Sequence, residues 1–202
     1  MPKIYFKRKN PDNKIALTFD DGPSEETEKI LDILKENDAK ATFFIWGQRI
    51  KGREKTIKRI IREGNEIGNH SYSHKKLWFR KRKEIEEEIG KCDEELEELR
   101  IKTNLFRPPA IRMGINLLLV CNKMKKKIII CDVISNDWKE QDANKIINKV
   151  LKKTKSGSIV NFHDYIEGMG PNKNIVRVIQ IIVPKLKEKY KLVTVSELLG
   201  GY

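Results

Sequence analysis

The chain has few of the residues that would mark it as disulfide-bonded or membrane-embedded. Its 202 residues include three cysteines, Cys92, Cys121 and Cys131, which cannot all pair and have no metal-type spacing. Such a set indicates buried thiols or a reducing compartment. No apolar run approaches the length of a membrane span, and residues 1–9 lack the apolar stretch of a signal peptide. We therefore expect a cytoplasmic protein, unless a leader was removed.

Long linkers, internal repeats and low-complexity tracts are also absent from the sequence. Apolar residues make up 39% and charged residues 35% of the chain, which is typical of a globular protein with a heavily charged surface. A chain of this length is most simply one domain, and it can bury roughly 70% of its unfolded surface. We therefore expect a single domain over residues 1–202.

The net charge of +13 has two interpretations. Lysines and glutamates alternate along most of the chain, which is typical of heat-adapted surfaces. The other interpretation is an anionic partner. Basic clusters lie at 80–83, beside Trp78 and Phe79, and at 123–127. Neither cluster falls in a specific nucleic-acid motif, and the oligomeric state stays open.

Short apolar runs alternate with amphipathic stretches along the chain. This alternation predicts an α/β fold with a mostly parallel sheet. Ser24 is the expected N-cap of the first helix, and Pro184 is expected to kink or divide the last long one. Ser196 is the expected cap of a final turn. Strands are predicted at 15–19, 41–46, 66–69, 103–106, 127–133, 158–162 and 192–195, and further helices at 56–63, 83–100, 115–124, 143–152 and 174–189.

Polar residues follow the ends of five separate predicted strands. A barrel brings such residues together, because its loops surround one mouth. An open sheet offers a crevice mainly at one switch point, and the chain has no Gly-rich phosphate loop between a strand and a helix. Because the chain is short for eight full units, we expect a distorted, incomplete (β/α) barrel.

The three histidines of the chain fit one metal-dependent hydrolytic site. His70 and His74 are four residues apart, and His163 ends an apolar run. Asp20 and Asp21 follow the first predicted strand. Two imidazoles and a carboxylate leave coordination positions free, as in a catalytic metal site. The alternative interpretation is two surface histidines and a simple Asp-Asp-Gly-Pro turn.

The remaining polar residues suit proton transfer. Asp20 is a candidate to accept a proton from water, held in place by Arg107. His163 is a candidate general acid for a leaving amine. Asp137 is a candidate to hydrogen-bond that imidazole and raise its pKa, and Trp138 to line the pocket. The alternatives are a surface arginine, a core histidine and a core aromatic residue.

Five ordered stretches of the sequence resemble the motifs of the polysaccharide deacetylase family, the NodB-homology domain of carbohydrate esterase family 4. The resemblance runs from about residue 14 to residue 199. The stretches are Thr18-Phe19-Asp20-Asp21-Gly22-Pro23-Ser24, His70-Ser71-Tyr72-Ser73-His74, Phe106-Arg107-Pro108-Pro109, Asp137-Trp138 and Phe162-His163-Asp164.

The resemblance implies a distorted (β/α) barrel of the NodB-homology type and removal of N-acetyl groups from N-acetylglucosamine-type sugars or oligosaccharides. It implies attack by a metal-bound water, with Asp20 as base and His163 as acid. One divalent ion is implied, zinc first, with cobalt, nickel or iron as alternatives. The other implied roles are metal ligation by Asp21, His70 and His74, tuning of the base by Arg107 and of the acid by Asp137, and oxyanion stabilisation by the backbone N–H of Ala110.

The chain departs from the family pattern around the expected substrate. Ala110 and Ile111 stand where the family has Tyr and Gly, and Ile134 replaces a common Asp. Asn161 stands where a Leu usually lines the acetyl-methyl pocket. Ala110, Trp138 and Asn161 are the expected substrate-binding residues. These departures keep two alternatives open, namely hydrolysis of another non-peptide C–N bond and a non-catalytic glycan-binding module.

Overall fold

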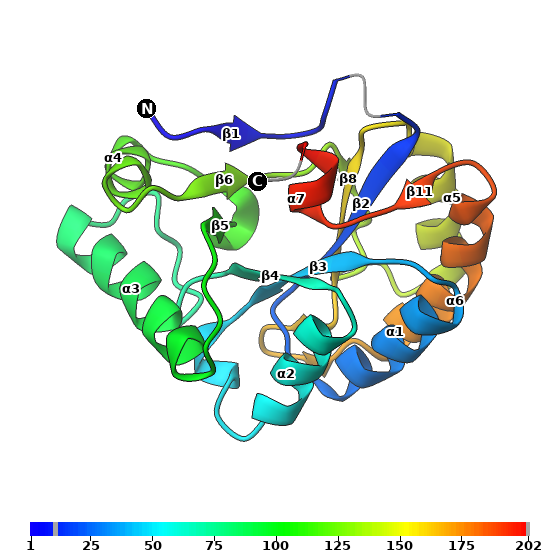
Figure 1. Ribbon diagram of the computed structural model, residues 1–202, viewed down its shortest axis with the longest axis horizontal. Helices are drawn as coiled ribbons and strands as arrows, with labels where there is room; N and C mark the ends of the chain where they lie inside the picture. The colour runs from blue at the N-terminus through cyan, green and yellow to red at the C-terminus, as the bar shows by residue number, and fades with distance from the viewer. Residues whose placement is uncertain (10–11, 201–202) are drawn as a thin grey trace.

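A curled parallel sheet forms an incomplete barrel with helices outside it (Figure 1). The structure is a computed structural model that describes residues 1–9 and 12–200. In spatial order the strands are β1 (Ile4–Tyr5), β6 (Lys127–Ile129), β5 (Leu105–Phe106), β4 (Glu66–Asn69), β3 (Ala41–Ile45), β2 (Lys14–Asp20), β8 (Ile159–His163) and β7 (Val133–Ile134), and β11 (Lys191–Leu192) pairs with β2.

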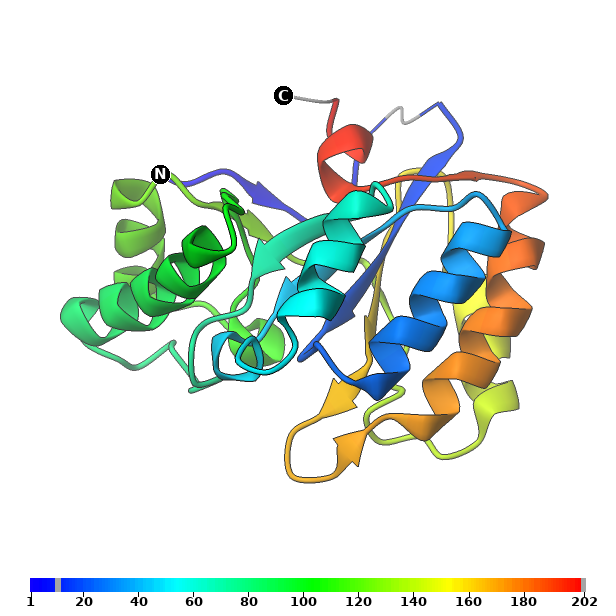
Figure 2. The ribbon, with the colours of Figure 1, turned by 60° about the horizontal axis from the view of Figure 1, so that its bottom comes forward.

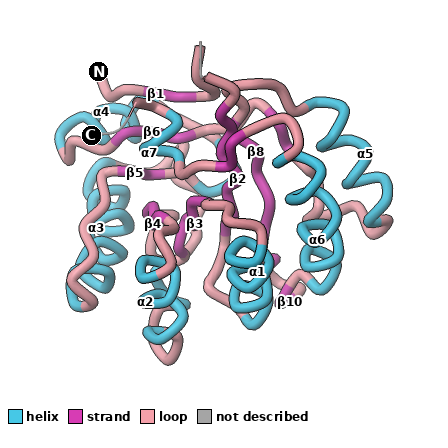
Figure 3. The backbone as a smooth tube through the Cα atoms, turned by 45° about the vertical axis from the view of Figure 1, so that its right-hand side comes forward, coloured by secondary structure: helices cyan, strands magenta, loops and turns pink. Residues whose placement is uncertain are grey.

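All the described helices except the short last one cover the outside of the sheet, and the last one packs against side chains inside the barrel. One pair, α3 and α4, lies at one end of the molecule, and α5 and α6 lie at the other, with α1 and α2 between them (Figure 1, Figure 3). None of the helices within the described residues has the length and apolar character needed to cross a bilayer. Their bounds are α1 (Glu25–Glu36), α2 (Glu54–Arg62), α3 (Arg82–Glu98), α4 (Ile115–Lys123), α5 (Ala143–Lys153), α6 (Lys173–Lys187) and α7 (Val195–Leu198).

Strand β2 shows how the sheet divides apolar from polar side chains. Successive side chains of a strand point to opposite faces. Ile15, Leu17 and Phe19 pack into the core shared with α1, α5 and α6. On the opposite face, Ala16 joins a second core cluster inside the barrel, and Asp20 lies at the strand's C-terminal end. The barrel interior is therefore apolar near the N-terminal ends of its strands and polar at the other end.

The first helix begins where the sequence predicts. Ser24 is its N-cap, and the Ser24 hydroxyl accepts a hydrogen bond of 3.2 Å from the Glu26 N–H. Acidic residues fill the first turn, where they complement the positive end of the helix dipole. The Ser24 hydroxyl also donates to the carbonyl of Asp164 at 2.7 Å. This contact ties the start of α1 to the end of β8.

The predicted strand 127–133 is in fact two strands, β6 and β7, that lie near opposite ends of the strand order of the sheet. Strand β6 pairs with β5, whereas β7 pairs with β8. Between them, the carbonyls of Ile129 and Ile130 accept hydrogen bonds from the guanidinium of Arg107 at 3.1 and 3.0 Å. Because these carbonyls accept hydrogen bonds from a side chain instead of a neighbouring strand, the hydrogen-bond ladder between β5 and β6 ends here. The chain then crosses to β8, with which β7 pairs.

The local structure near the C-terminus differs from the prediction in three places. The last strand ends at Leu192, and Thr194 caps α7 in place of Ser196. Helix α6 runs through Pro184 without dividing. An antiparallel hairpin that was not predicted, β9 (Tyr165–Ile166) and β10 (Gly170–Pro171), projects before α6 and is orange in Figure 2. This hairpin adds residues to the rim of the site.

Candidate active site

The predicted site residues gather at the C-terminal end of the barrel. Asp20 ends β2, His70 follows β4, and His163 ends β8. They line a cavity of about 510 Å³. Its other lining residues are Asp21, His74, Lys76, Pro109, Ala110, Ile111, Arg112, Ile134, Asn136, Trp138, Asn161, Ile166 and Glu167.

Asp21, His70 and His74 form a compact group of potential metal ligands. One ligand atom from each lies within 4.8 Å of the others. Oδ1 of Asp21 is 3.2 Å from Nε2 of His70 and 3.0 Å from Nε2 of His74. The group is largely buried, since Asp21 is 5% and His70 2% exposed. The three side chains therefore converge on one point at the cavity wall.

The hydrogen bonds behind the two imidazoles indicate that this point suits a cation. Nδ1 of His70 lies 2.7 Å from the carbonyl oxygen of Arg107, and Nδ1 of His74 lies 3.0 Å from Oε2 of Glu167. An oxygen acceptor at Nδ1 places the ring proton there, so each neutral imidazole directs the lone pair of Nε2 at Asp21. Oδ1 of Asp21 is buried and has no hydrogen-bond donor among the described residues. Three lone pairs that face one another repel unless a cation lies between them, so the residues fit a metal ion.

The carboxyl group of Asp21 stays ionised in this setting. Burial by itself would raise its pKa, but in the metal-free protein, where His70 and His74 can carry a proton on Nε2, their hydrogen bonds and charge hold the pKa of Asp21 well below its usual range. An ionised carboxylate is the form that binds a divalent ion.

The loops that carry the ligands adopt uncommon backbone conformations. Asp21, Ser71 and His74 have φ angles of 70°, 66° and 57°. Residues other than glycine rarely adopt this left-handed region, and such conformations persist where surrounding structure enforces them. Here they turn the chain sharply at the strand ends, so that Asp21 and His74 face the same cavity.

Asp20 is held from two sides. Nη1 of Arg107 donates to Oδ1 of Asp20 at 2.7 Å and also to the hydroxyl of Thr18 at 2.7 Å. Nδ2 of Asn161 donates to Oδ2 of Asp20 at 2.7 Å. Arg107 is fully buried, and its guanidinium lies 4.1 Å from the ring centroid of Phe44. Asp20 is thus fixed in orientation with one edge toward the cavity.

His163 is held by Asp137. Nδ1 of His163 lies 2.9 Å from Oδ1 of Asp137, and the backbone N–H of His163 donates to Oδ2 at 2.7 Å. Ser135 and Asn172 also donate to this carboxylate, at 2.6 and 3.1 Å. Burial lowers the pKa of His163, but the charge and hydrogen bond of Asp137 outweigh it and raise that pKa to about 9. The imidazole is therefore protonated at neutral pH.

The structure separates the other predicted residues into those in the cavity and those behind it. Ala110, Trp138 and Asn161 line the cavity, and Trp138 is 45% exposed at its rim. Arg107 and Asp137 lie behind the wall and reach the cavity through Asp20 and His163. Ala110 has a φ of 57°, which turns the chain at the end of β5. The proposed oxyanion contact of its N–H stays a prediction.

Two residues beside the predicted site residues have no role in the prediction from the sequence. Glu167 reaches His74 from the β9–β10 hairpin, and no sequence motif marks it. Asp164 follows His163 directly and is fully buried. Thr27 donates a hydrogen bond to its carboxylate. Burial and the nearby charge of Asp21 raise the pKa of Asp164 to about 7.

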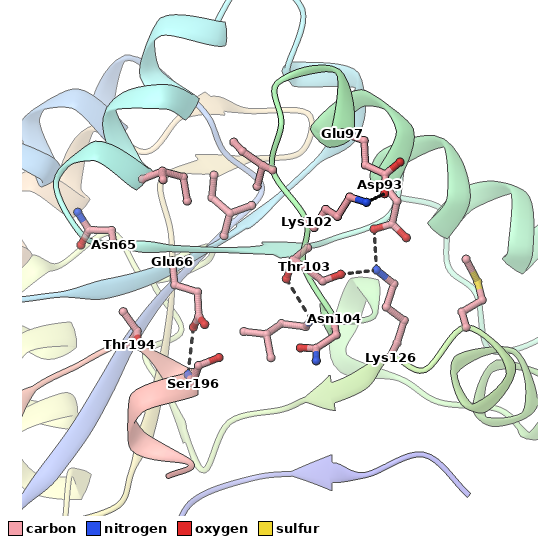
Figure 4. Close-up of a pocket in the computed structure, with 15 residues that line it drawn as sticks. Asn65, Glu66, Asp93, Glu97, Lys102, Thr103, Asn104, Lys126, Thr194 and Ser196 are labelled. Atoms are coloured by element: carbon pink, nitrogen blue, oxygen red, sulfur yellow. Dashed lines mark hydrogen bonds and ion pairs between the residues drawn. The ribbon is translucent and has the colours of Figure 1, made fainter. Parts of the chain in front are cut away.

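A larger cavity, of about 770 Å³, lies at the opposite end of the barrel (Figure 4). It lies between β4 and β5, two strands whose pairing is limited to the residues Asn69 and Phe106. Glu66, Asp93 and Lys126 lie among its lining residues, and Lys126 is paired with Asp93 at 2.6 Å. None of the ten predicted site residues lines it. Size alone therefore does not locate the site, whereas the convergent polar groups do.

The fold and the site together define a class, the carbohydrate esterase family 4 type of incomplete barrel. A family model described as polysaccharide deacetylase matches residues 7–129, which is more than half of the chain. The chain belongs to the polysaccharide deacetylase family. The predicted family and the predicted incomplete barrel are both confirmed.

Several curated relatives of the chain are peptidoglycan deacetylases by name. A peptidoglycan-N-acetylglucosamine deacetylase of Bacillus cereus is 33% identical over 204 residues, covering 98% of this chain and 94% of the relative. The peptidoglycan-N-acetylmuramic acid deacetylase PdaC of Bacillus subtilis (strain 168) is 36% identical over 193 residues, covering 94% of this chain. The chain spans 39% of the length of PdaC.

Solved structures with this fold include an enzyme and a protein called a pseudoenzyme. The Bc1960 peptidoglycan N-acetylglucosamine deacetylase matches with a TM-score of 0.92 at 34% identity, covering 98% of this chain and 94% of that one. The BA3943 family 4 pseudoenzyme from Bacillus anthracis matches with a TM-score of 0.89 at 27% identity, covering 98% of this chain and 69% of that one. Family membership alone therefore does not decide activity, and the site residues must.

Proposed function

We propose that the protein is a metal-dependent N-deacetylase that acts on N-acetylglucosamine-type units of a glycan such as peptidoglycan. The observation that carries the proposal is the Asp21, His70 and His74 group, which shares one cavity with Asp20 and His163. The names of the relatives support the substrate class.

The metal-ligand group supplies the electrophilic part of the reaction. Asp21, His70 and His74 would hold one divalent ion, and a bound ion of this kind polarises a carbonyl and lowers the pKa of water. Mixed imidazole and carboxylate ligands suit zinc, with cobalt, nickel or iron as alternatives. Glu167 and the Arg107 carbonyl orient the two imidazoles, as partners behind metal ligands commonly do.

Asp20 is the proposed base. It would take a proton from the water that attacks the acyl carbon. Arg107 and Asn161 keep the Asp20 carboxylate turned toward the cavity while this happens. The backbone N–H of Ala110 is the proposed donor to the negative charge that develops on the acyl oxygen.

His163 is the proposed acid. Its Nδ1 is engaged by Asp137, so Nε2 would carry the proton that passes to the nitrogen of the sugar as the C–N bond breaks. Such a group contributes about 10²–10⁴-fold in rate. The products are acetate and a free amino sugar, which balances the addition of one water.

The experiment is acetate release from N-acetylglucosamine oligomers in the presence of zinc or cobalt. Asp20→Asn should abolish release, because the amide cannot accept the proton. Asp38→Asn is the matched control, since Asp38 is exposed and distant from the cavity, and it should keep full activity. Elemental analysis must show the metal bound in both variants. A metal-loaded wild type that releases nothing from any N-acylated glycan would contradict the proposal.

Asn161 favours a second candidate, hydrolysis of another small N-acyl group. The polar amide of Asn161 lines the cavity beside Asp20. A panel of formyl, acetyl and longer acyl substrates separates the two candidates. A clear acetyl preference would rule out the second one.

A further inference from the structure

Large apolar side chains are exposed together on one surface near the active site. Phe79 is 90% exposed, Ile115 is 73% exposed and Leu119 is 39% exposed. Ile115 and Leu119 are four residues apart on α4, so they lie on the same side of the helix. On the opposite side of α4, Leu117 and other residues belong to a buried cluster that α4 shares with α3. Phe79 precedes α3 in the loop that packs against α4.

This loop is held firmly against the start of α4. Nδ2 of Asn116 donates to the carbonyl of Arg80 at 3.1 Å, and Nε of Arg82 donates to Oδ1 of Asn116 at 3.4 Å. A side chain at Gly114 would overlap the carbonyl of Trp78, so the two backbones are in close contact. The Trp78 ring lies 5.7 Å from that of Phe79. Phe79 therefore stays exposed on a fixed loop.

Positive side chains lie against Trp78, the neighbour of Phe79. The guanidinium of Arg112 lies 4.9 Å from the ring centroid of Trp78, and the ammonium of Lys76 lies 5.9 Å from it. Acidic neighbours are fewer, with Glu84 near Arg80 at 3.6 Å and Glu86 paired with Lys123 at 2.9 Å. We call this surface the aromatic–basic patch, and its members are Lys76, Trp78, Phe79, Arg80, Lys81, Arg82, Arg112, Ile115 and Leu119.

The combination of side chains selects one kind of partner. A soluble polyanion would engage the cations but would leave Phe79 and Ile115 in water. An anionic lipid surface satisfies both, because apolar side chains enter the boundary of the acyl chains while Lys and Arg reach the headgroups. Aromatic residues favour that boundary, and basic residues gain from the negative surface potential.

We propose that the aromatic–basic patch docks the protein on a membrane surface that contains anionic lipid. Lys76 and Arg112 belong both to the patch and to the lining of the active-site cavity. Docking would therefore place the mouth of the cavity beside the lipid surface and direct the enzyme to glycan close to it. The proposal does not depend on the acyl group that the site removes.

The test is co-sedimentation of the whole protein with vesicles of phosphatidylcholine alone or of phosphatidylcholine with phosphatidylglycerol. Binding should require phosphatidylglycerol. The double variant F79S/I115S keeps every charge and should weaken binding at least about tenfold, because it removes the two most exposed apolar groups of the patch. Phe6→Ser is the matched control, since Phe6 is 50% exposed outside the patch, and it should bind like the wild type.

Three results would overturn the proposal. One is the absence of binding to vesicles that contain phosphatidylglycerol. Another is that the double variant binds these vesicles as well as the wild type does and that added salt abolishes the binding, which would indicate that charge alone drives it. The third is that the double variant loses as much affinity for a soluble anionic polymer as it loses for the vesicles, which would indicate a glycan or polymer site. Thermal unfolding of each variant confirms that it is folded.

Discussion

Asn161 donates a hydrogen bond of 2.7 Å to Oδ2 of Asp20, the oxygen that Arg107 does not contact. The proposed base therefore has a permanent donor on each oxygen. The same amide lines the cavity. Asn161 thus links the orientation of the base to the shape and polarity of the space in which the acyl group would lie.

Replacing Asn161 with leucine should change the choice of acyl group. The variant gives an apolar surface beside the acyl carbon, where a methyl group gains from burial. A methyl-sized difference in a pocket is worth about 1–3 kcal/mol, so the ratio of kcat/KM for acetyl over formyl substrate should rise about tenfold. Asn148→Leu, on the exposed side of α5, is the control. An unchanged ratio would show that Asn161 does not contact the acyl group.

Arg107→Ala should destabilise the protein strongly. The substitution leaves the buried carboxylate of Asp20 without its charged partner and the carbonyls of Ile129 and Ile130 without donors. Breaking a buried ion pair costs about 3–5 kcal/mol, which for a chain of this size lowers Tm by roughly 6–20 °C. Thermal unfolding followed by circular dichroism measures the shift. The exposed Arg177→Ala should leave Tm nearly unchanged, and a similarly small shift for Arg107→Ala would contradict a structural role of the pair.

The sequence was sufficient to predict the residues that follow strand ends. Short apolar runs locate the strands, and parallel strands bring their C-terminal ends together, so Asp21, His70 and His74 were expected to meet. The structure brings them within 4.8 Å. The same reasoning gives the N-cap at Ser24, because capping depends on residues that are close in sequence.

Other contacts between distant residues could not be predicted from the sequence. The strand 127–133 divides because the guanidinium of Arg107, about twenty residues away, binds two of its carbonyls. Glu167 meets His74 across 93 positions of the chain. Gly168 and Gly170 mark a turn there, but a turn signal does not show which distant side chain Glu167 will meet. The bond from Asn161 to Asp20 depends on the pairing of β2 with β8. Local propensity contains no information on any of these pairings.

The pH dependence of the reaction should have an alkaline limb set by His163. A general acid must be protonated, and Asp137 raises the pKa of His163 to about 9, so kcat should fall as pH rises through about 9. The same raised pKa stabilises the folded protein fully below about pH 6.5, the ordinary value for histidine, and this contribution is lost as pH rises through about 9. A rate profile with zinc at saturation measures the limb.

Asp137→Asn tests the origin of that limb. The neutral amide removes the charge that raises the pKa of His163, so the alkaline limb should move toward lower pH and kcat at pH 8 should fall. Asp142→Asn, at the exposed N-cap of α5, is the control and should keep the limb in place. An unshifted limb in Asp137→Asn would mean that another group sets it.

Metal binding should depend on Glu167 and on pH. In the metal-free protein, burial lowers the pKa of His74, but Asp21 and Glu167 outweigh it and raise that pKa above its ordinary value. Protons therefore compete with the metal, and zinc affinity should fall as pH falls through the range in which His74 takes up a proton.

The variant Glu167→Gln removes the charged partner of Nδ1 of His74. Loss of such a partner costs about 10–100-fold in metal affinity, and because Glu167 is exposed, we expect about tenfold. Titration with a competing zinc chelator at two pH values measures both effects. Glu98→Gln, exposed at the end of α3, is the control, and equal affinities for the two variants would show that Glu167 does not support the metal ligand.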